Sequence, residues 1–219
     1  MRLVSAIVLA AGCSGPATMA TPDAPSPTDG TTPGAPGLYI TWTTASTVPG
    51  TAATGITVDS ITLRVRHLRA IGDSGGGDGR TEQESSTVQW SAGQSPAVVA
   101  FPDAPTGLYS KLSFELDGQV IQSSFDIRGT AVVDGQTKAF EIHDRDETHV
   151  NLDVERDLLP GGRVSLFVSL DLEAALAGID FTKLSDDGSG GLELDTNDAQ
   201  MSAFRSKLQQ SFSTDDNPH

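Results

Sequence analysis

Residues 150–170 read Val-Asn-Leu-Asp-Val-Glu-Arg-Asp-Leu-Leu-Pro-Gly-Gly-Arg-Val-Ser-Leu-Phe-Val-Ser-Leu. Apolar and polar side chains alternate on both sides of Pro160-Gly161-Gly162. A period of two is typical of a strand with one buried face, and a Pro-Gly-Gly sequence is typical of a turn. The stretch therefore predicts two long strands joined by a turn.

Alternation recurs upstream of this stretch. Strong alternating runs cover residues 38–42, 61–66 and 112–116, and weaker ones cover 87–90, 98–101, 123–133 and 136–142. Asp117-Gly118 and Asp134-Gly135 predict tight hairpin turns with positive φ at both central residues. The polar, glycine-rich residues 72–86 predict a long loop. Strands at regular spacing with short turns predict a mainly-β fold, an antiparallel β-sandwich that is immunoglobulin-like or related.

The C-terminal part has a different pattern. Residues 172–177 predict a short helix ended by Gly178, and Asn197 with Gln200 predicts a capping box. A helix of about 15 residues then follows, with one apolar stripe that suits docking on the sheet. The stripe consists of Met201, Phe204, Leu208 and Phe212. We expect a sandwich over residues 38–172 and a helical extension with a frayed tail over residues 173–219.

The N-terminus carries the pattern of an export signal. Arg2 precedes an apolar stretch over residues 3–11 that is too short to span a bilayer. The small residues Ala11 and Gly12 then precede Cys13, the chain's one cysteine. This pattern resembles the lipobox of bacterial prolipoproteins. The resemblance implies that residues 1–12 are removed, that Cys13 carries the lipid, and that Ser14 permits sorting to the outer membrane in a host that has one.

Residues 13–37 are rich in Pro, Thr and Gly and offer almost nothing to bury. Such a composition predicts a disordered tether between the lipidated cysteine and the folded domain. The sequence from Pro105 to Tyr109, together with the terminal helix, is loosely similar to uncharacterised sandwich domains of bacterial surface lipoproteins. That similarity concerns the fold and implies no function.

The charge of the chain limits its partners. There are 29 Asp and Glu against 14 Lys and Arg, which gives a formal net charge of −15. Sequence-independent nucleic-acid binding requires a basic surface, so nucleic acid is excluded as a partner. The partners expected are the membrane, through the lipid, and an envelope protein. No cofactor is expected apart from the covalent lipid.

Two segments are candidates for binding. His143 and His149, with Asp146 between them, form a potential Zn²⁺ or Cu²⁺ site, and the alternative is a solvated charged loop. Arg64 and Arg66 share one strand face, where they either bind an anionic partner or pair with cross-strand carboxylates.

Residues 186–193, rich in Asp and Gly, permit either a calcium-loop or a polar-turn interpretation. The calcium pattern requires acidic side chains at its first and last positions, and Ser185 and Thr196 occupy them here. The polar turn is therefore the simpler interpretation.

The sequence places no catalytic motif in the context that its chemistry requires. Ser74 has Gly-x-Ser-x-Gly spacing, but it lies in the predicted polar loop rather than in a strand-to-helix elbow, and residues 72–79 lack the spacing of a dinucleotide or phosphate loop. We therefore expect a non-catalytic binding or structural module of the cell envelope. A metal-binding lipoprotein using the 143–149 loop and a hydrolase with an unrecognised site are the alternatives.

Overall fold

The computed structural model describes residues 34–72, 80–94, 98–118 and 122–215, and the folded unit begins at Gly34. The expected signal segment, Cys13 and most of the expected tether lie outside the described residues. Within the described part of the chain, no helix has the length and apolarity required to cross a bilayer.

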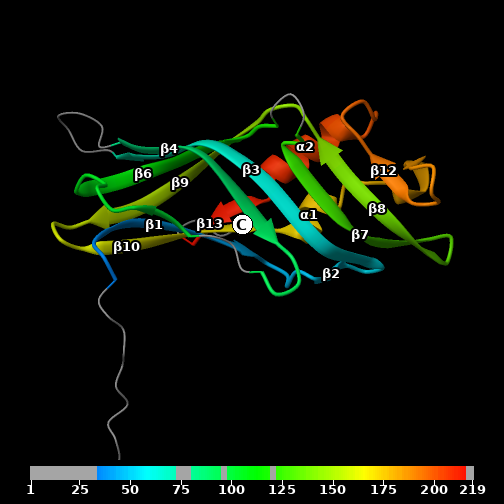
Figure 1. Cartoon of the computed structure of the whole chain (residues 1–219), viewed down its shortest axis with the longest axis horizontal. Coiled ribbons are helices and arrows are strands. Elements are labelled where there is room, and N and C mark those ends of the chain that lie inside the picture. Colours follow the sequence, from blue (N-terminus) through cyan, green and yellow to red (C-terminus); the bar gives the residue numbers. More distant parts are fainter. Residues whose placement is uncertain (1–33, 73–79, 95–97, 119–121, 216–219) are drawn as a thin grey trace, which may run out of the picture. The chain divides into compact units, whose positions relative to one another are not determined.

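The larger of two sheets is built around one long strand, β3 (Figure 1). Its main path runs in the order β11-β12-β8-β7-β3-β6-β9, and β2 and β4 also pair with β3. The strands are β2 (Gly50–Ala53), β3 (Ile56–Gly72), β4 (Arg80–Trp90), β6 (Gly107–Leu116), β7 (Phe125–Val133), β8 (Gln136–Asp144), β9 (Thr148–Leu158), β11 (Ser185–Asp186) and β12 (Leu192–Leu194). Residues 56–63 of β3 pair with β7 and residues 65–72 pair with β6, so β3 connects two branches of the sheet.

The smaller sheet has the order β13-β10-β1-β5. Its strands are β1 (Gly37–Thr44), β5 (Val99–Phe101), β10 (Arg163–Leu170) and β13 (Phe212–Thr214). β1 and β10 pair in parallel, from Gly37 opposite Arg163 to Thr44 opposite Leu170. β12 also pairs in parallel with β8. The sandwich is therefore confirmed, and both sheets are mixed rather than antiparallel throughout.

The parallel pairs arise from the connections. Pro160-Gly161-Gly162 separates β9 from β10 as predicted, but it carries the chain from the larger sheet to the smaller one. The two strands therefore do not form a hairpin, and β10 pairs with the first strand of the unit instead.

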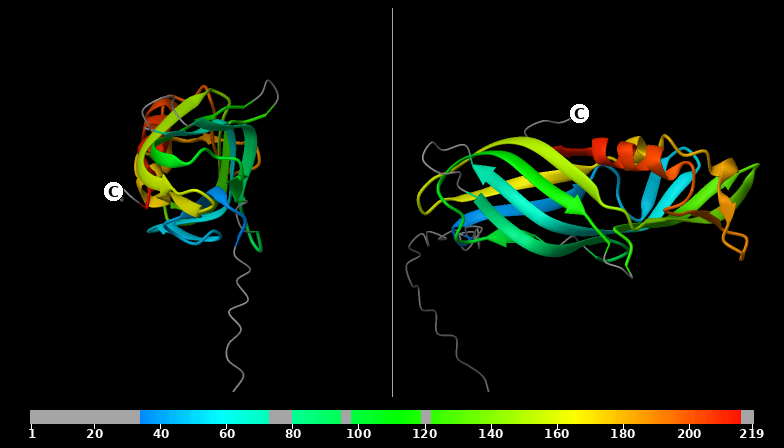
Figure 2. Two further views of the ribbon diagram at one scale, coloured as in Figure 1. Left: turned by 90° about the vertical axis from the view of Figure 1, so that its left-hand side faces the viewer. Right: turned by 90° about the horizontal axis from the view of Figure 1, so that it is seen from above.

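Two helices complete the layer that faces the larger sheet. α1 (Leu172–Leu176) follows β10, and α2 (Met201–Gln210) leads into β13. Figure 2 shows α2 and β13 on the same side of the larger sheet. A 3-10 turn, η1 (Phe181–Lys183), precedes β11.

Aromatic contacts join these layers into one core. The ring of Phe114 meets Trp42 at 5.2 Å and Phe212 at 5.3 Å, both edge to face. Phe125 of β7 packs on Phe204 of α2 at 5.6 Å. Strands from distant parts of the sequence therefore share one apolar interior.

The predicted turns had different outcomes. Asp134 (φ 52°) and Gly135 (φ 75°) form the hairpin turn between β7 and β8 as predicted. Asp117-Gly118 does not form a hairpin, because β6 and β7 pair with successive parts of β3 rather than with each other. The predicted loop over 72–86 is also shorter than expected, since residues 80–86 already belong to β4.

The C-terminal helices confirm one prediction from the sequence and contradict another. α1 is present, and the Asp171 carboxylate caps it by accepting a hydrogen bond from Ala174 N. α2 begins after Gln200, which makes no side-chain cap hydrogen bond, so the predicted N-cap at Asn197 was wrong. The backbone N–H of Asn197 instead donates to Asp195 Oδ1 at 2.8 Å. Phe212, placed on the helix by its spacing, begins β13.

Two tyrosines anchor the starts of strands in the same way. Tyr39 Oη donates to Ala35 O at 2.8 Å, and Tyr109 Oη donates to Pro105 O at 2.7 Å. Each tyrosine follows a Gly-Leu pair whose glycine has a positive φ, 128° at Gly37 and 139° at Gly107. Both sheets therefore have the same tyrosine-to-carbonyl hydrogen bond where a long strand begins.

Candidate functional site

A break in the alternation of β3 creates the candidate site. Ile61, Leu63 and Val65 face the core, and after the break Leu68 and Ala70 do so. The register with β6 shifts between Arg66 and Arg69, which marks a β-bulge. His67 lies in this bulge with φ 47°, a left-handed conformation that is uncommon outside glycine. The bulge leaves Arg66 and His67, adjacent in sequence, both partly exposed.

His67 belongs to a group of imidazoles and carboxylates contributed by β3, β4, β6, β9 and the loop before β9. We call this group the His/Glu cluster. It consists of His67, Glu82, Glu84, Glu115, Glu147 and His149. β6 and β9 pair Glu115 directly opposite His149, and β3 and β6 pair Arg66 opposite Glu115. Strand register therefore brings together residues that are far apart in sequence.

Glu115 lies at the centre of the His/Glu cluster, because each of its carboxylate oxygens faces one imidazole. Oε1 is 3.5 Å from His149 Nδ1, and Oε2 is 3.8 Å from His67 Nε2. The Glu115 side chain is 22% exposed, whereas that of His149 is 64% exposed. The carboxylate is thus partly shielded, while one of its imidazoles remains accessible to solvent.

Further carboxylates contact the other nitrogen of each ring. Glu147 Oε1 is 2.7 Å from His149 Nε2. Glu82 Oε1 and Glu84 Oε2 are each 3.4 Å from His67 Nδ1. Each imidazole thus lies between carboxylates, with one ring nitrogen toward Glu115 and the other toward a further glutamate.

Two arginines flank one side of the cluster. Arg69 Nη2 is 3.0 Å from Glu82 Oε1, and Arg66 Nη2 is 3.3 Å from Glu84 Oε1. Hydrogen bonding to Glu82 raises the pKa of Arg69, and hydrogen bonding to Asp117 and Glu84 raises that of Arg66. The arginines thus offset the charge of the β4 carboxylates, while Glu115 and Glu147 face imidazoles.

A shallow hollow of about 260 Å³ opens beside Glu115. Its lining includes His67, Arg69, Glu115, His149 and Asn151. Ionisable and amide side chains thus dominate the polar wall of this hollow, which suits a small hydrated ion better than an apolar ligand.

Of the three residues of the predicted metal site, His143 and Asp146 line one hollow of about 360 Å³, and His149 lies elsewhere. His143 lies between Glu193 (3.2 Å) and Glu141 (3.6 Å) on β12 and β8. Asp146 forms an ion pair with Arg205 at 2.7 Å. His149 belongs to the His/Glu cluster, on a strand separated from β8 by β7, β3 and β6 in the sheet order. The structure therefore retains His149 as a candidate ligand but does not group it with His143 or Asp146.

The arginine pair predicted as an anion site contacts groups of the chain itself. Arg66 pairs with Asp117 and Glu84, which is the cross-strand alternative. Arg64 donates to the backbone carbonyl of Ser123. Both arginines line a hollow of about 270 Å³, but their guanidinium groups already have acceptors.

The aspartate-rich loop at residues 186–191 is a polar turn. Asp187 Oδ1 accepts hydrogen bonds from Ser189 N (2.7 Å) and Gly191 N (2.9 Å), and Asp186 Oδ1 accepts from Gly188 N (2.7 Å). Bonds from the Ser189 backbone and hydroxyl lead the effects that lower the pKa of Asp187. These carboxylates thus stabilise their own loop.

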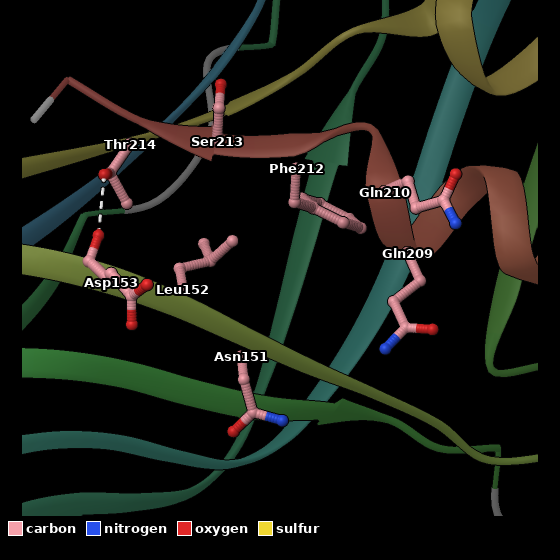
Figure 3. Close-up of a pocket in the computed structure, with 8 residues that line it drawn as sticks. All are labelled: Asn151, Leu152, Asp153, Gln209, Gln210, Phe212, Ser213 and Thr214. Atoms are coloured by element: carbon pink, nitrogen blue, oxygen red, sulfur yellow. Dashed lines mark hydrogen bonds between the residues drawn. The ribbon is translucent and has the colours of Figure 1, made fainter. Parts of the chain in front are cut away.

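A further hollow, of about 370 Å³, lies between β9 and the junction of α2 with β13 (Figure 3). Figure 3 shows Leu152 and Phe212 in the gap between the two segments, with Gln209 extending from α2 toward β9. Thr214 Oγ1 donates to Asp153 O at 3.1 Å across it. Amides and hydroxyls dominate the lining, which provides hydrogen bonding but no cluster of ionisable groups.

Sequence reasoning missed His67, Glu82, Glu84, Glu115 and Glu147 as members of one cluster. One signal was present: Arg66-His67 puts two polar residues in succession between Val65 and Leu68, which predicts a bulge. The partners on β4 and β6 follow only from strand register, which no local pattern of the sequence specifies.

Comparison of the chain with protein-family models, with curated protein sequences and with solved structures found no match. We therefore interpret the molecule from the chemistry and geometry of its own residues.

Proposed function

We propose that this protein is a lipid-anchored cell-envelope protein whose folded unit is a non-catalytic binding module displayed from the membrane. The observation that carries the proposal is the order of the N-terminal residues: Arg2, a short apolar segment, Ala11-Gly12 and then Cys13. The Pro- and Thr-rich segment that follows supplies a spacer before the unit that starts at Gly34. In a host with an outer membrane, Ser14 directs the protein there.

A binding role fits the chemistry of the folded unit. The faces with polar hollows carry carboxylates, imidazoles, amides and hydroxyls rather than a nucleophile oriented by a base. The net charge of −15 over the full chain disfavours binding to nucleic acid. The protein's partners are then the membrane, an envelope protein, or a cation held by the carboxylates.

Anchoring is tested by Cys13→Ala in the full chain, expressed in a bacterium that processes lipoproteins. We expect the wild type to incorporate labelled palmitate and to sediment with membranes. Cys13→Ala should lose the label and move to the soluble or secreted fraction, because stable anchoring requires the acyl chains on that thiol. A Thr21→Ala variant in the spacer is the matched control and should label normally. Unchanged labelling of Cys13→Ala contradicts the proposal.

A further inference from the structure

One ring nitrogen of His67 is approached by two carboxylates together. Glu82 Oε1 and Glu84 Oε2 each lie 3.4 Å from His67 Nδ1. We propose that His67, Glu82 and Glu84 bind one divalent transition-metal ion of the Zn²⁺ class on the partly exposed face of β3 and β4. The proposal goes beyond lipid anchoring and does not depend on it, because none of the three residues belongs to the N-terminal segment. It also differs from the site expected from sequence, since neither His143 nor His149 is a ligand.

The pairing of β3 with β4 brings the three residues together. The antiparallel register is the same on both sides of the bulge, and it places His67 opposite Glu84. Opposite residues of an antiparallel pair have Cβ atoms about 4.5–5.5 Å apart, which suits an imidazole and a carboxylate that share an ion. Glu82 lies two positions along β4 and so shares a face with Glu84. One ligand atom from each of the three residues lies within 4.8 Å of the other two.

The spacing of the ligand atoms suits a small ion. Zn–N and Zn–O bonds of about 2.0–2.2 Å at tetrahedral angles separate neighbouring ligand atoms by roughly 3.3–3.6 Å. Both contacts of His67 Nδ1 fall in this range, at 3.4 Å. One nitrogen and two oxygens leave a fourth position for water. The Glu84 side chain is 68% exposed, so water can reach that position.

The direction of approach distinguishes His67 from two other histidines that lie between glutamates. Glu115, Glu147 and His149 also offer ligand atoms within 4.8 Å of one another. However, Glu115 faces Nδ1 of that ring and Glu147 faces Nε2. His143 has the same arrangement, with one glutamate at each nitrogen. Carboxylates at opposite ring nitrogens do not converge on one ion, whereas the two at His67 Nδ1 do.

The second nitrogen of the His67 ring has a carboxylate of its own. Metal binding at Nδ1 requires a neutral imidazole with its proton on Nε2. Glu115 Oε2 lies 3.8 Å from Nε2, so its negative charge faces that proton. Carboxylates in this position are typical behind metal-bound histidines. The ion would thus take the place of a proton on Nδ1, between the same two carboxylates.

Two arginines contact the proposed ligands from outside. Arg69 Nη2 is 3.0 Å from Glu82 Oε1, and Arg66 Nη2 is 3.3 Å from Glu84 Oε1. The hydrogen bond to Asp117 contributes more than that to Glu84 to the raised pKa of Arg66, so Glu84 is its secondary partner. Carboxylates that bind a metal generally accept such hydrogen bonds, which orient them. The arginines therefore leave Glu84 Oε2 directed at the imidazole.

Ligand type decides the class of ion. Ca²⁺ and Mg²⁺ are held by shells of oxygen ligands, whereas imidazole nitrogen favours Zn²⁺, Cu²⁺ and Ni²⁺. One imidazole and two carboxylates form a mixed set of nitrogen and oxygen ligands, and Zn²⁺ accepts both types.

The test is a calorimetric titration of the full chain, purified in detergent, with Zn²⁺. The ligand variants are His67→Asn, Glu82→Gln and Glu84→Gln. Asn tolerates the left-handed backbone at position 67 and so keeps the bulge intact. His149→Ala is the matched control, because His149 also lies between two glutamates of the same cluster. Circular dichroism and thermal melting verify that every variant is folded.

We expect the wild type to bind one equivalent of Zn²⁺. Each ligand variant should weaken binding by roughly tenfold or more, because losing a ligand costs at least as much as losing an outer contact. His149→Ala should bind like the wild type. In nitrogen NMR spectra of the imidazoles, Zn²⁺ should shift Nδ1 of His67 more than Nε2, and Ca²⁺ should shift neither.

Three results overturn the proposal. The first is a wild-type chain without saturable Zn²⁺ binding. The second is a loss in His149→Ala as large as that in His67→Asn, which would place the ion at the other group. The third is a Zn²⁺ titration in which Nε2 of His67, rather than Nδ1, carries the larger shift.

Discussion

At the scale of single residues, the two tyrosines offer a matched pair, because they donate the same kind of bond in different surroundings. Tyr109 is 1% exposed, and burial raises its pKa, whereas Tyr39 is half-buried with Arg163 stacked 4.1 Å above its ring. Tyr109→Phe should lower the free energy of unfolding by about 1–2 kcal/mol, since a buried bond is lost without a replacement by water. Tyr39→Phe should cost about 0.5 kcal/mol or less, because its bond is exposed to solvent.

Urea unfolding of the two variants measures this difference directly. Equal losses of unfolding free energy would mean that burial of the hydroxyl does not determine how much this hydrogen bond stabilises the protein. Both substitutions keep the aromatic ring, so the core contacts of Tyr109 and the cation–π contact of Tyr39 remain as internal controls.

At the scale of elements, the contact of β7 with both of its neighbours depends on Gly129. A Cβ at this position would lie 2.0 Å from Thr57 O on β3 and 2.9 Å from Phe140 Cζ on β8. Gly129→Ala should therefore destabilise the protein by about 2–3 kcal/mol, because backbone and ring must both move.

Gly135→Ala is the control for Gly129→Ala. A Cβ on Gly135 meets nothing within 4 Å, so the cost there is confined to the positive φ of 75° and should be about 1 kcal/mol. Thermal melting ranks the two variants, and an equal or smaller loss in Gly129→Ala would contradict the packing argument.

A strand could be predicted from the sequence where it buries apolar residues at every second position. β1, β6, β9 and β10 do so and were predicted by alternation alone. The first half of β4 does not, because residues 81–87 are polar on both faces and are held by backbone pairing to β3. Likewise, parallel pairing of β1 with β10 leaves no trace in either strand's own sequence.

The candidate site was harder to predict than the strands. The sequence spacing predicted His143 and His149 as ligands of one metal site. The two residues are close in sequence, but they lie on β8 and β9, which are not neighbours in the sheet. His149 finds its partner across a strand pair, in Glu115. A site whose residues meet through strand register can be predicted only when the order of the strands in the sheet is known. A local sequence motif does not contain that order.

At the scale of the whole molecule, one buried ion pair joins α2 to the larger sheet. Asp144, at the end of β8, is fully buried and accepts from Arg205 Nη2 at 2.8 Å and from Arg145 N at 2.8 Å. Burial acts to raise the pKa of Asp144, but hydrogen bonds from Arg205, Asp146 N and Thr196 outweigh it, so the pKa is lowered. The carboxylate therefore favours the folded state only while it is ionised.

Stability should fall in acid for this reason. The folded pKa of Asp144 lies below the unfolded value of about 3.9, so its contribution is present above that value and is lost as pH falls through the folded pKa. Asp144→Asn should lower the free energy of unfolding at pH 7 by about 3 kcal/mol, because a neutral amide replaces the buried carboxylate that pairs with Arg205. The variant should also show a weaker decline between pH 5 and acid conditions than the wild type.

Urea titrations at a series of pH values test this prediction. Asp146→Asn is the matched control, because Asp146 contacts the same arginine but is 56% exposed and should contribute about 1 kcal/mol or less. An Asp144→Asn variant that keeps the full acid dependence of the wild type would assign that dependence to other carboxylates.

The parallel pairing of β1 with β10 has a consequence for the order in which the sheet forms during synthesis. Gly37–Thr44 is synthesised early, yet its hydrogen-bonding partner on one edge is Arg163–Leu170. The first strand therefore remains unpaired along that edge until most of the chain has been synthesised. Closing so long a loop is slow, and an unpaired strand edge invites association with other chains. A chaperone that shields unpaired strand edges would therefore act on this strand.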